Sequence, residues 1–346
     1  MAEPILMLTD IWYFACLSNG LRPGKTCAVT LLGEPILLGR TEAGDVFAMR
    51  DLCPHRGMPL SCGRFDGQEV ECPYHGWRFD QRGVCTAIPS LVDAQDFDIA
   101  RIKVRPFPVR EVNGNIWVWM GKRAPDREPP QVPHFANDRR SNLSVVMRLP
   151  CDIDQAALGL LDPAHGPYVH SSWFWRSQRS IHEKCKAFAP TATGFAMVRH
   201  RPSSNSFAYK LLGGTPNTEI EFQLPGVRIE HIEIGRHHVV NFTTVTPIDD
   251  HTTEITNQLY WSQGWVALFK PILWVFARTF LNQDRVAMQK LSGGLRHDPS
   301  TMLIPEADIQ GRWYYRLKAA WARYRDGGED AVFENPVKAA TLRWRT

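Results

Sequence analysis

The sequence predicts an α+β protein of two domains, one β-rich and N-terminal, the other combining an antiparallel sheet with a long helix. Three observations lead to this fold class. The first 120 residues contain short apolar or aromatic runs separated by Gly, Pro and Asp. A proline-rich segment follows, and the remainder contains strand-like runs ahead of a long helical pattern. At 346 residues the chain is long enough for each domain to bury its own core.

The N-terminal domain is marked by strand-like runs at 12–14, 36–38 and 116–120. The last run is followed by the segment GKRAPDREPPQVPHF, whose prolines cannot continue a helix or a central strand. This segment is a natural domain boundary. We therefore expect the first domain to cover residues 1–124 and the second to cover residues 125–346.

The C-terminal domain begins with helical spacing over residues 152–169 and ends with a helical pattern from about residue 265 to residue 291. Five strand-like runs lie between these helices, at 196–200, 219–223, 228–234, 238–245 and 254–261. This order predicts an antiparallel sheet accompanied by helices. We find no internal repeat and no low-complexity tract.

Composition narrows the class of protein. The balance of 44% hydrophobic and 22% charged residues is that of a soluble globular chain. The net charge of +4 is mild and its basic residues are scattered, so we expect no nucleic-acid partner. No secretory signal precedes the eight cysteines, which favours a reducing, cytoplasmic location.

One apolar segment, residues 264–281, resembles a membrane span but is interrupted by Lys270, Pro271 and Arg278. We expect no transmembrane anchor and interpret the segment as a buried or pocket-lining helix. A helix that touches a membrane surface is the alternative.

The strongest motif is Cys53-Pro54-His55 followed, after sixteen residues, by Cys72-Pro73-Tyr74-His75. Structural zinc sites more often pair the cysteines together and the histidines together. Here each loop offers one thiolate and one imidazole, which suits a [2Fe–2S] cluster whose two irons have different ligands. Buried thiols beside unrelated histidines are the competing interpretation, which four matched residues in two loops make improbable.

With CPHRG and CPYHGWRFD, the chain resembles the Rieske family, and more narrowly the α subunits of Rieske non-haem iron oxygenases. The resemblance implies that Cys53, His55, Cys72 and His75 hold a Rieske cluster. The Rieske protein of respiratory complexes has an extra cysteine in each loop, whereas this chain has Met58 and Tyr74 near those positions.

A second candidate metal site lies in Asp162-Pro-Ala-His165-Gly-Pro-Tyr-Val-His170. Non-haem Fe(II) that activates O₂ usually has two His and one carboxylate on one face. Residues five apart on an ideal helix point about 140° from each other, so His165 and His170 need a distortion to share a metal. Gly166-Pro167 supplies a break between them. Alone, this spacing is a weak signal, since two unrelated histidines give it as well.

The same segment matches the iron-site motif of the resembled family. The resemblance implies that His165 and His170 bind Fe(II), and that Asp162 is not a ligand but bridges toward the cluster of a neighbouring subunit. This chain departs from the family in having Gly159 where Asn is frequent and Leu158 where an acidic residue is usual.

The carboxylate ligand must come from further along the chain. The candidates are Asp249, Asp250, Glu254, Asp284 and Asp298. Asp284 lies within the long apolar helix, where a carboxylate needs a partner, and the alternatives for it are a salt bridge to Arg285 or a solvated position. The third ligand of the family also sits in a late helix, and we choose Asp284.

The resemblance implies an N-terminal Rieske domain and a C-terminal helix-grip catalytic domain, in which residues from about 171 to 262 line the pocket. It also implies a homotrimer in which each cluster reduces the iron of the adjacent subunit. The chain has no dinucleotide-binding fingerprint, so a separate NAD(P)H-dependent reductase, with or without a ferredoxin, must supply the electrons.

The expected activity is hydroxylation or oxidative demethylation of an organic substrate with O₂ as co-substrate. Ring cis-dihydroxylation uses the same ligands and stays open, as do two non-catalytic classes, an electron carrier and a lipid-binding helix-grip module. Four aromatic residues of the long helix favour a bulky apolar or polycyclic substrate: Trp265, Phe269, Trp274 and Phe276.

Overall fold

The computed structural model describes residues 6–92, 94–170, 179, 181–202, 216–328 and 331–346. Its contacts divide the chain into two compact units. One consists of Thr9–Pro129 with Asn137–Arg139, and the other of Pro130–Ala136 and Arg140–Thr346 with the described residues before Thr9. The division falls inside the proline-rich segment, whereas the domain boundary between residues 124 and 125 stays a prediction.

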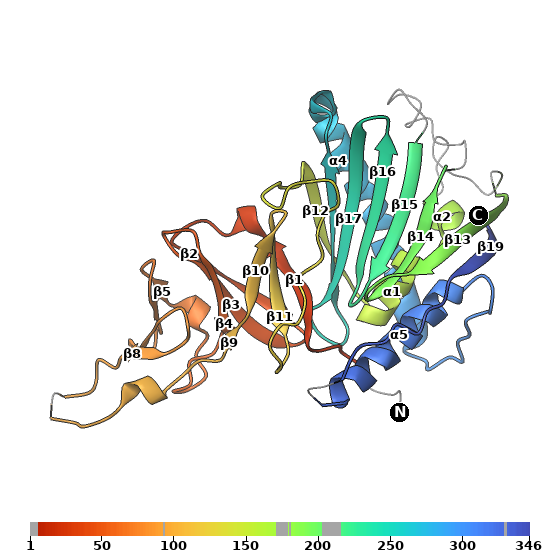
Figure 1. Ribbon diagram of the computed structural model, residues 1–346. Helices are drawn as coiled ribbons and strands as arrows, with labels where there is room; N and C mark the ends of the chain where they lie inside the picture. Colours follow the sequence, from red (N-terminus) through yellow and green to blue (C-terminus); the bar gives the residue numbers. More distant parts are fainter. Residues whose placement is uncertain (1–5, 93, 171–178, 180, 203–215, 329–330) are drawn as a thin grey trace. The chain divides into compact units, whose positions relative to one another are not determined.

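The N-terminal unit is β-rich, as the sequence predicts, and contains three small antiparallel sheets (Figure 1). The first has the order β1-β11-β10, the second β2-β3-β4-β9 and the third β5-β6-β7-β8. The strands of the first two sheets are β1 (Ile11–Leu17), β2 (Lys25–Leu31), β3 (Glu34–Arg40), β4 (Val46–Arg50), β9 (Pro106–Phe107), β10 (Val109–Val112) and β11 (Asn115–Met120). The third sheet consists of β5 (Arg64–Phe65), β6 (Val70–Glu71), β7 (Arg78–Phe79) and β8 (Cys85–Ala87).

Aromatic side chains stabilise the first sheet. Strand β11 is buried along its whole length, and its Trp119 ring meets the Trp12 ring of β1 edge-on at 5.3 Å. Burying a large apolar side chain stabilises a fold by roughly 1.5–3 kcal/mol. A second core gathers around the third sheet and includes Cys53, Cys72 and Phe79. Two of the predicted cluster ligands therefore belong to the packed interior of this unit.

The C-terminal unit is built on one eight-stranded antiparallel sheet with the order β12-β18-β17-β16-β15-β14-β13-β19. Its strands are β12 (Leu143–Leu149), β13 (Glu183–Pro190), β14 (Gly194–His200), β15 (Pro216–Gln223), β16 (Val227–Ile234), β17 (His237–Pro247), β18 (Thr253–Trp261) and β19 (Ala340–Arg345). All five expected strand-like runs lie in this sheet.

The helices of this unit are α1 (Ile153–Leu161), α2 (Gly166–Val169), α4 (Lys270–Leu295) and α5 (Ile309–Asp326). A 3-10 segment, Gly264–Phe269, leads into α4. Asp152 caps α1 by accepting a hydrogen bond from the Gln155 N–H at 2.8 Å. The helical pattern over 152–169 is therefore interrupted, because α1 ends at Leu161 and the short α2 begins only at Gly166.

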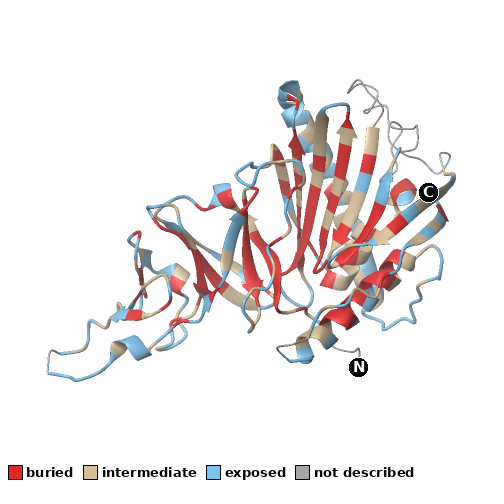
Figure 2. Cartoon of the chain, viewed as in Figure 1, coloured by how far each residue is buried: buried red, intermediate tan, exposed pale blue. Residues whose placement is uncertain are grey.

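Helix α4 covers one face of the sheet near β12 (Figure 1), through Leu273, Ala277 and Leu281. This arrangement of a long helix on an antiparallel sheet confirms the predicted helix-grip fold class. The segment departs from the expectation of a buried or pocket-lining helix at its start: Leu268, in the 3-10 segment before α4, is 81% exposed, and Ile272, in the first turn of α4, is 65% exposed. Figure 2 shows this exposure near the start of the helix.

The aromatic residues that favoured a bulky substrate lie on the same exposed part. Trp265, Phe269, Trp274 and Phe276 are each 39–46% exposed. By length and composition alone, Gly264–Leu295 would suffice to cross a membrane: the mean hydropathy of its most apolar window is 1.3, and 6% of that window is buried. A single helix of this kind is weak support for a membrane span.

Candidate functional site

Two loops of the N-terminal unit present the Cys and His residues of the strongest motif. The first, Cys53–Met58, lies between β4 and β5, and the second, Cys72–Trp77, between β6 and β7. Their backbones follow the same hydrogen-bond pattern. The Cys53 N–H donates to the Met58 carbonyl at 2.8 Å, and the Cys72 N–H donates to the Trp77 carbonyl at 2.8 Å.

Each loop closes through a glycine four residues after its cysteine. The Gly57 N–H donates to the Cys53 carbonyl at 2.8 Å, and the Gly76 N–H donates to the Cys72 carbonyl at 3.1 Å. Both glycines are left-handed, with φ of 73° and 69°, a conformation in which any side chain is strained. The glycines that follow the motifs are therefore required by the two matched turns.

The two cysteines are buried and lie close enough to affect each other. Burial raises the pKa of the Cys53 thiol to about 11, the neighbouring Cys72 thiol adds to the rise, and the N–H groups of His55 and Arg56 partly oppose it. A thiol whose pKa is raised in this way stays protonated in neutral solution unless a metal displaces the proton and binds the thiolate. The pair therefore suits an iron–sulfur cluster better than it suits solvent-accessible thiol chemistry.

The two loop histidines face the same region, with ring centroids 4.6 Å apart. The His55 Nδ1 atom is buried and has no hydrogen-bond partner within the described residues. The indole of Trp77 stacks on the His55 ring at 4.5 Å and an interplanar angle of 4°, which holds the ring in place. A buried ring nitrogen without a partner is costly unless a metal takes its lone pair, so these residues fit a Rieske cluster.

The C-terminal unit brings together His165, His170 and Asp284, whose potential ligand atoms lie within 4.8 Å of one another. The Nε2 atoms of the two histidines are 3.2 Å apart. Asp284 Oδ1 lies 3.0 Å from Nε2 of His170 and 3.9 Å from Nε2 of His165. His170 is 5% exposed, so this group is largely shielded from water.

The local backbone explains how two histidines five residues apart can meet. Asp162 follows the last residue of α1, and its Oδ1 accepts a hydrogen bond from the Ala164 N–H at 2.6 Å. The chain turns there, and the short α2 begins with Gly166-Pro167. His165 precedes α2 and His170 follows it, so both rings can point to the same place. The expected break between the two histidines is present.

The outer nitrogens of the two rings determine which atoms remain free for a cation. His170 Nδ1 lies 3.0 Å from Gln283 Oε1, and His165 Nδ1 lies 3.6 Å from Asp162 Oδ2. Since the Gln283 oxygen can only accept, Nδ1 of His170 carries the proton and its Nε2 offers a lone pair. The Asp162 oxygen is too far from His165 Nδ1 for a hydrogen bond, but its negative charge favours a proton on that nitrogen and a lone pair on Nε2. Two lone pairs and the Asp284 carboxylate then converge with no proton between them, an arrangement that a cation stabilises.

Nearby charges shift the pKa values of His165 and of its neighbour Asp162. Burial alone would lower the pKa of His165, but the carboxylates of Asp162 and Asp284 outweigh it and raise the pKa. Burial also acts on Asp162, yet the nearby His165 imidazole and the hydrogen bond from the Ala164 N–H lower the pKa of that carboxyl. The Asp162 carboxylate therefore stays ionised and orients the His165 ring.

The other candidate carboxylates lie elsewhere in the described chain. Asp249 and Asp250 occupy the exposed turn after β17, and Asp298 is exposed beyond α4. Glu254 lies on β18, 3.7 Å from Arg148. Of the five candidates, Asp284 is the one whose carboxylate meets the two histidines.

Sequence analysis missed two residues of α4 that support this group. Gln283 contacts His170 Nδ1, and the Phe280 ring stacks on the His170 ring at 3.6 Å and 14°. With Asp284 they occupy helical positions i, i+3 and i+4, which share one face. Once Asp284 had been chosen, this spacing could have indicated that Phe280 and Gln283 lie on the same side of the helix as the metal group.

A pocket of about 370 Å³ adjoins the metal group. His165, Asp162 and Asp284 form part of its wall, and most of the remaining lining is apolar: Leu158, Leu161, Val169, Ala287, Met288, Leu291, Leu303 and Ala307. Gly159 also lines the pocket, and a Cβ there would lie 3.0 Å from the Met288 methyl group. Glycine thus lets α1 approach α4 where the family frequently has Asn.

The four aromatic residues that favoured a bulky substrate are absent from this lining. Because these side chains are exposed and do not line the pocket, they no longer support a bulky or polycyclic substrate. The region 171–262, expected to line the pocket, includes residues 171–178, 180 and 203–215, which lie outside the described residues.

Comparison with known proteins identifies the N-terminal unit directly. A family model described as the Rieske [2Fe-2S] domain matches residues 11–105, which include all four predicted cluster ligands. The oxygenase component of dicamba O-demethylase from Stenotrophomonas maltophilia is 35% identical over 164 residues, 46% of this chain and 47% of that protein. Chlorophyllide a oxygenase from Chlamydomonas reinhardtii is 34% identical over 169 residues, 49% of this chain and 25% of that protein.

A longer match is Protein TIC 55 from Arabidopsis thaliana, 26% identical over 324 residues, 92% of this chain and 58% of that protein. The chain thus spans less than two thirds of these relatives. Among solved structures, dicamba monooxygenase bound to dicamba superposes with a TM-score of 0.74 at 21% identity, covering 92% of this chain and 99% of the other. The chain therefore contains a Rieske [2Fe-2S] domain, is similar to the oxygenases named above, and shares the fold of dicamba monooxygenase.

Proposed function

We propose that this chain is the oxygenase component of a Rieske-type system, which uses O₂ and externally supplied electrons to hydroxylate or oxidatively demethylate a small, largely apolar molecule. The observation that carries the proposal is that one chain holds two unlike sets of metal ligands, the Cys/His loops and the group of two His and one carboxylate. An electron carrier needs only the first set, and a lipid-binding module needs neither.

The first set consists of Cys53, His55, Cys72 and His75. Two thiolates and two imidazoles make a [2Fe–2S] cluster less negative than four thiolates do, and so raise its reduction potential. The cluster supplies single electrons. Around it, Trp77 holds the His55 ring, and the matched turns at Gly57 and Gly76 keep the loops in place.

The second set consists of His165, His170 and Asp284, which would bind Fe(II) on one face and leave positions open. Iron held this way supplies O₂ activation. Asp162 and Gln283 keep the two imidazoles in the tautomer that offers Nε2, and Phe280 fixes the His170 ring. An apolar substrate that fills the pocket beside the group would exclude water from the reacting centre.

The substrate class is inferred from the pocket and the relatives. A cavity of about 370 Å³ lies near the lower end of the roughly 300–1,000 Å³ range of small-molecule sites. Two relatives are named as O-demethylases, of dicamba and of 5,5'-dehydrodivanillate. A small aromatic methyl ether satisfies both observations, and we propose O-demethylation ahead of ring cis-dihydroxylation.

The partners follow from the same proposal. The relatives are named as an oxygenase component and an oxygenase subunit, so a separate reductase, with or without a ferredoxin, is proposed here as well. We also propose a homotrimer in which Asp162 lies between the iron group and the cluster of the next subunit. A cytoplasmic location stays a prediction, since some relatives are chloroplast proteins.

The experiment that tests the proposal is turnover of a substrate panel by the iron-loaded protein with a surrogate reductase. The panel pairs aryl methyl ethers with the same rings lacking the methyl group. Release of formaldehyde is expected for the ethers only, and the phenol formed should keep its original oxygen, because hydroxylation of the methyl group sends the oxygen from O₂ into the formaldehyde. Turnover of the unmethylated rings to cis-diols would replace demethylation by dihydroxylation. No substrate-dependent consumption of O₂, with neither formaldehyde nor diol formed while both metal sites are full, would contradict the oxygenase function.

A further inference from the structure

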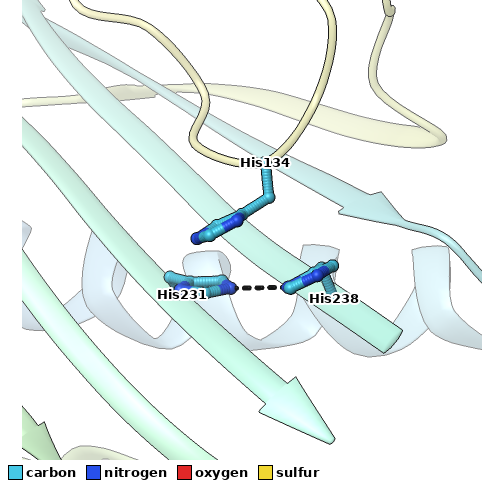
Figure 3. Close-up of side chains that lie close together, drawn as sticks. All are labelled: His134, His231 and His238. Atoms are coloured by element: carbon cyan, nitrogen blue, oxygen red, sulfur yellow. Dashed lines mark hydrogen bonds between the residues drawn. The ribbon is translucent and has the colours of Figure 1, made fainter. Parts of the chain in front are cut away.

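A second group of three possible metal ligands lies in the C-terminal unit, on residues distinct from the iron group. His134 precedes β12, His231 lies on β16 and His238 lies on β17 (Figure 3). Their potential ligand atoms all lie within 4.8 Å of one another. Sequence analysis gave no signal for this group, because its members are separated along the chain and only the strand register brings them together.

The register of the β16–β17 hairpin explains how two of the rings meet. His231 pairs with Val240, and His238 pairs with Glu233. Side chains alternate between the two faces of a sheet, so His231 and His238 are diagonal neighbours on one face. Val245 and its partner Ile255 belong to the other face, which packs under α4. The histidines therefore lie on the sheet face opposite to this helix.

The distance between the first two rings suits a shared metal ion. His231 Nε2 and His238 Nδ1 are 3.0 Å apart. Two ring nitrogens that bind one Zn²⁺ at about 2.0–2.1 Å and a tetrahedral angle lie about 3.3 Å apart. The separation at the proposed iron group is 3.2 Å. A small outward shift of either histidine would therefore admit a cation between the two nitrogens.

His134 adds a third imidazole from a separate segment. Its ring stacks on His231 at 4.1 Å and on His238 at 4.4 Å. Its backbone has φ of 63°, a left-handed conformation that is uncommon for any residue with a side chain. The residue is exposed, and one of its ring nitrogens already lies within 4.8 Å of a nitrogen of each of the other two rings. Figure 3 shows the ring lying over the pair.

The protonation state of His231 suits a cation, while the nearest acid and base, Glu233 and Arg199, offset each other. Burial and the adjacent imidazoles lower the pKa of His231 to about 4, so this ring is neutral at neutral pH. Glu233 lies on the same face, and its carboxylate contacts Arg199 at 2.5 Å. Three imidazoles without a thiolate select a borderline divalent metal such as Zn²⁺, Ni²⁺ or Cu²⁺ rather than Ca²⁺ or Mg²⁺.

We propose that His134, His231 and His238 bind a divalent transition metal of the zinc class at a site separate from the mononuclear iron. Bound there, the ion would tie the segment Pro130–Ala136 to the β16–β17 hairpin. Pro130–Ala136 is the part of the proline-rich segment that belongs to the C-terminal unit, so the ion would stabilise the attachment of that segment to the sheet.

The test uses iron-loaded full-length protein kept free of O₂, dialysed against Zn²⁺ and analysed for both metals. The wild-type chain should take up one zinc per chain without losing iron. His134→Ala and His238→Ala should weaken zinc binding at least about 100-fold, since losing even an outer partner of a metal ligand costs about 10–100-fold. His237→Ala is the matched control, because it lies next to His238 on the same strand and faces the other side of the sheet.

A second measurement, the melting temperature with and without Zn²⁺, tests the proposal even if one of the variants folds poorly. Zn²⁺ should raise the melting temperature of the wild type and of His237→Ala, but not that of His134→Ala, whose side chain is exposed. A His165→Ala variant should keep its zinc, which separates this site from the iron group. Zinc uptake that survives in His134→Ala and His238→Ala, or that disappears in His165→Ala, would overturn the proposal.

Discussion

The two proposed iron sites are built in opposite ways. The cluster loops are local: each supplies one Cys and one His within four residues, and each is held by the same backbone hydrogen bonds. The mononuclear group joins a turn after α1 to a helix more than a hundred residues later. A local site depends on turn geometry, whereas a distant one depends on how α1, α2 and α4 pack. The two sites should therefore fail independently.

The largest effect is expected from Asp284→Ala. Its carboxylate lies 3.0 Å from His170, and two imidazoles alone hold Fe(II) poorly. The variant should lose the mononuclear iron and all turnover while its cluster spectrum is unchanged, as measured by metal analysis and visible absorption. Glu254→Ala is the control, since Glu254 faces Arg148 instead. An Asp284→Ala protein with full iron and turnover would mean that the third ligand lies elsewhere.

The complementary variant, His55→Cys, should affect the cluster alone. A third thiolate makes the cluster more negative, so its potential should fall toward the value of about −400 mV typical of plant-type ferredoxins, or the cluster should be lost. Voltammetry and absorption spectra measure the change, and iron bound by the second group should remain. An unchanged potential and spectrum would exclude His55 as a ligand.

Asp162→Asn tests the connection between the sites. Asn can still accept the Ala164 N–H, so the turn after α1 should survive, but the charge beside His165 is removed. We expect both metals to remain and most turnover to be lost, with cluster re-oxidation by O₂ slowed in a single turnover. If Asp162 only caps the turn, the variant would re-oxidise at the wild-type rate.

Gln283→Leu should have the smallest effect of the series. The change removes the acceptor for His170 Nδ1, and loss of such a partner weakens metal binding by about 10–100-fold. Gln283→Glu retains an acceptor and should stay near the wild-type affinity. Iron titration of the apo-protein distinguishes the two. Equal affinities in the Leu and Glu variants would show that Gln283 does not orient the ring.

The contrast between the sites also explains what could be predicted from the sequence. The Cys53 and Cys72 loops are short motifs that their spacing reveals. The spacing of His165 and His170 is a weak signal alone, and the pair was recognised because its segment matches the iron-site motif of the resembled family. Asp284 had to be chosen among five carboxylates, and the support from Gln283 and Phe280 appears only when α4 is placed beside His170.

The fold could likewise be predicted only as far as local patterns reveal it. These patterns gave the strands and the long helix. The helical pattern over 152–169 could not reveal that α1 stops at Leu161, because that end depends on the Asp162 turn. The helical pattern from about residue 265 to residue 291 could not reveal that the start of α4 is exposed. An apolar helix has the same sequence pattern whether or not the face turned away from the sheet is covered.

The central claim, two dissimilar iron sites in one chain, is tested most directly by Mössbauer spectroscopy of reduced protein reconstituted with labelled iron. The claim predicts about three irons per chain, two with the parameters of an unequally ligated [2Fe–2S] cluster and one of mononuclear high-spin Fe(II). The mononuclear component alone should vanish in Asp284→Ala. A wild-type spectrum without that component, or one in which Asp284→Ala removes cluster and mononuclear iron together, would contradict the claim.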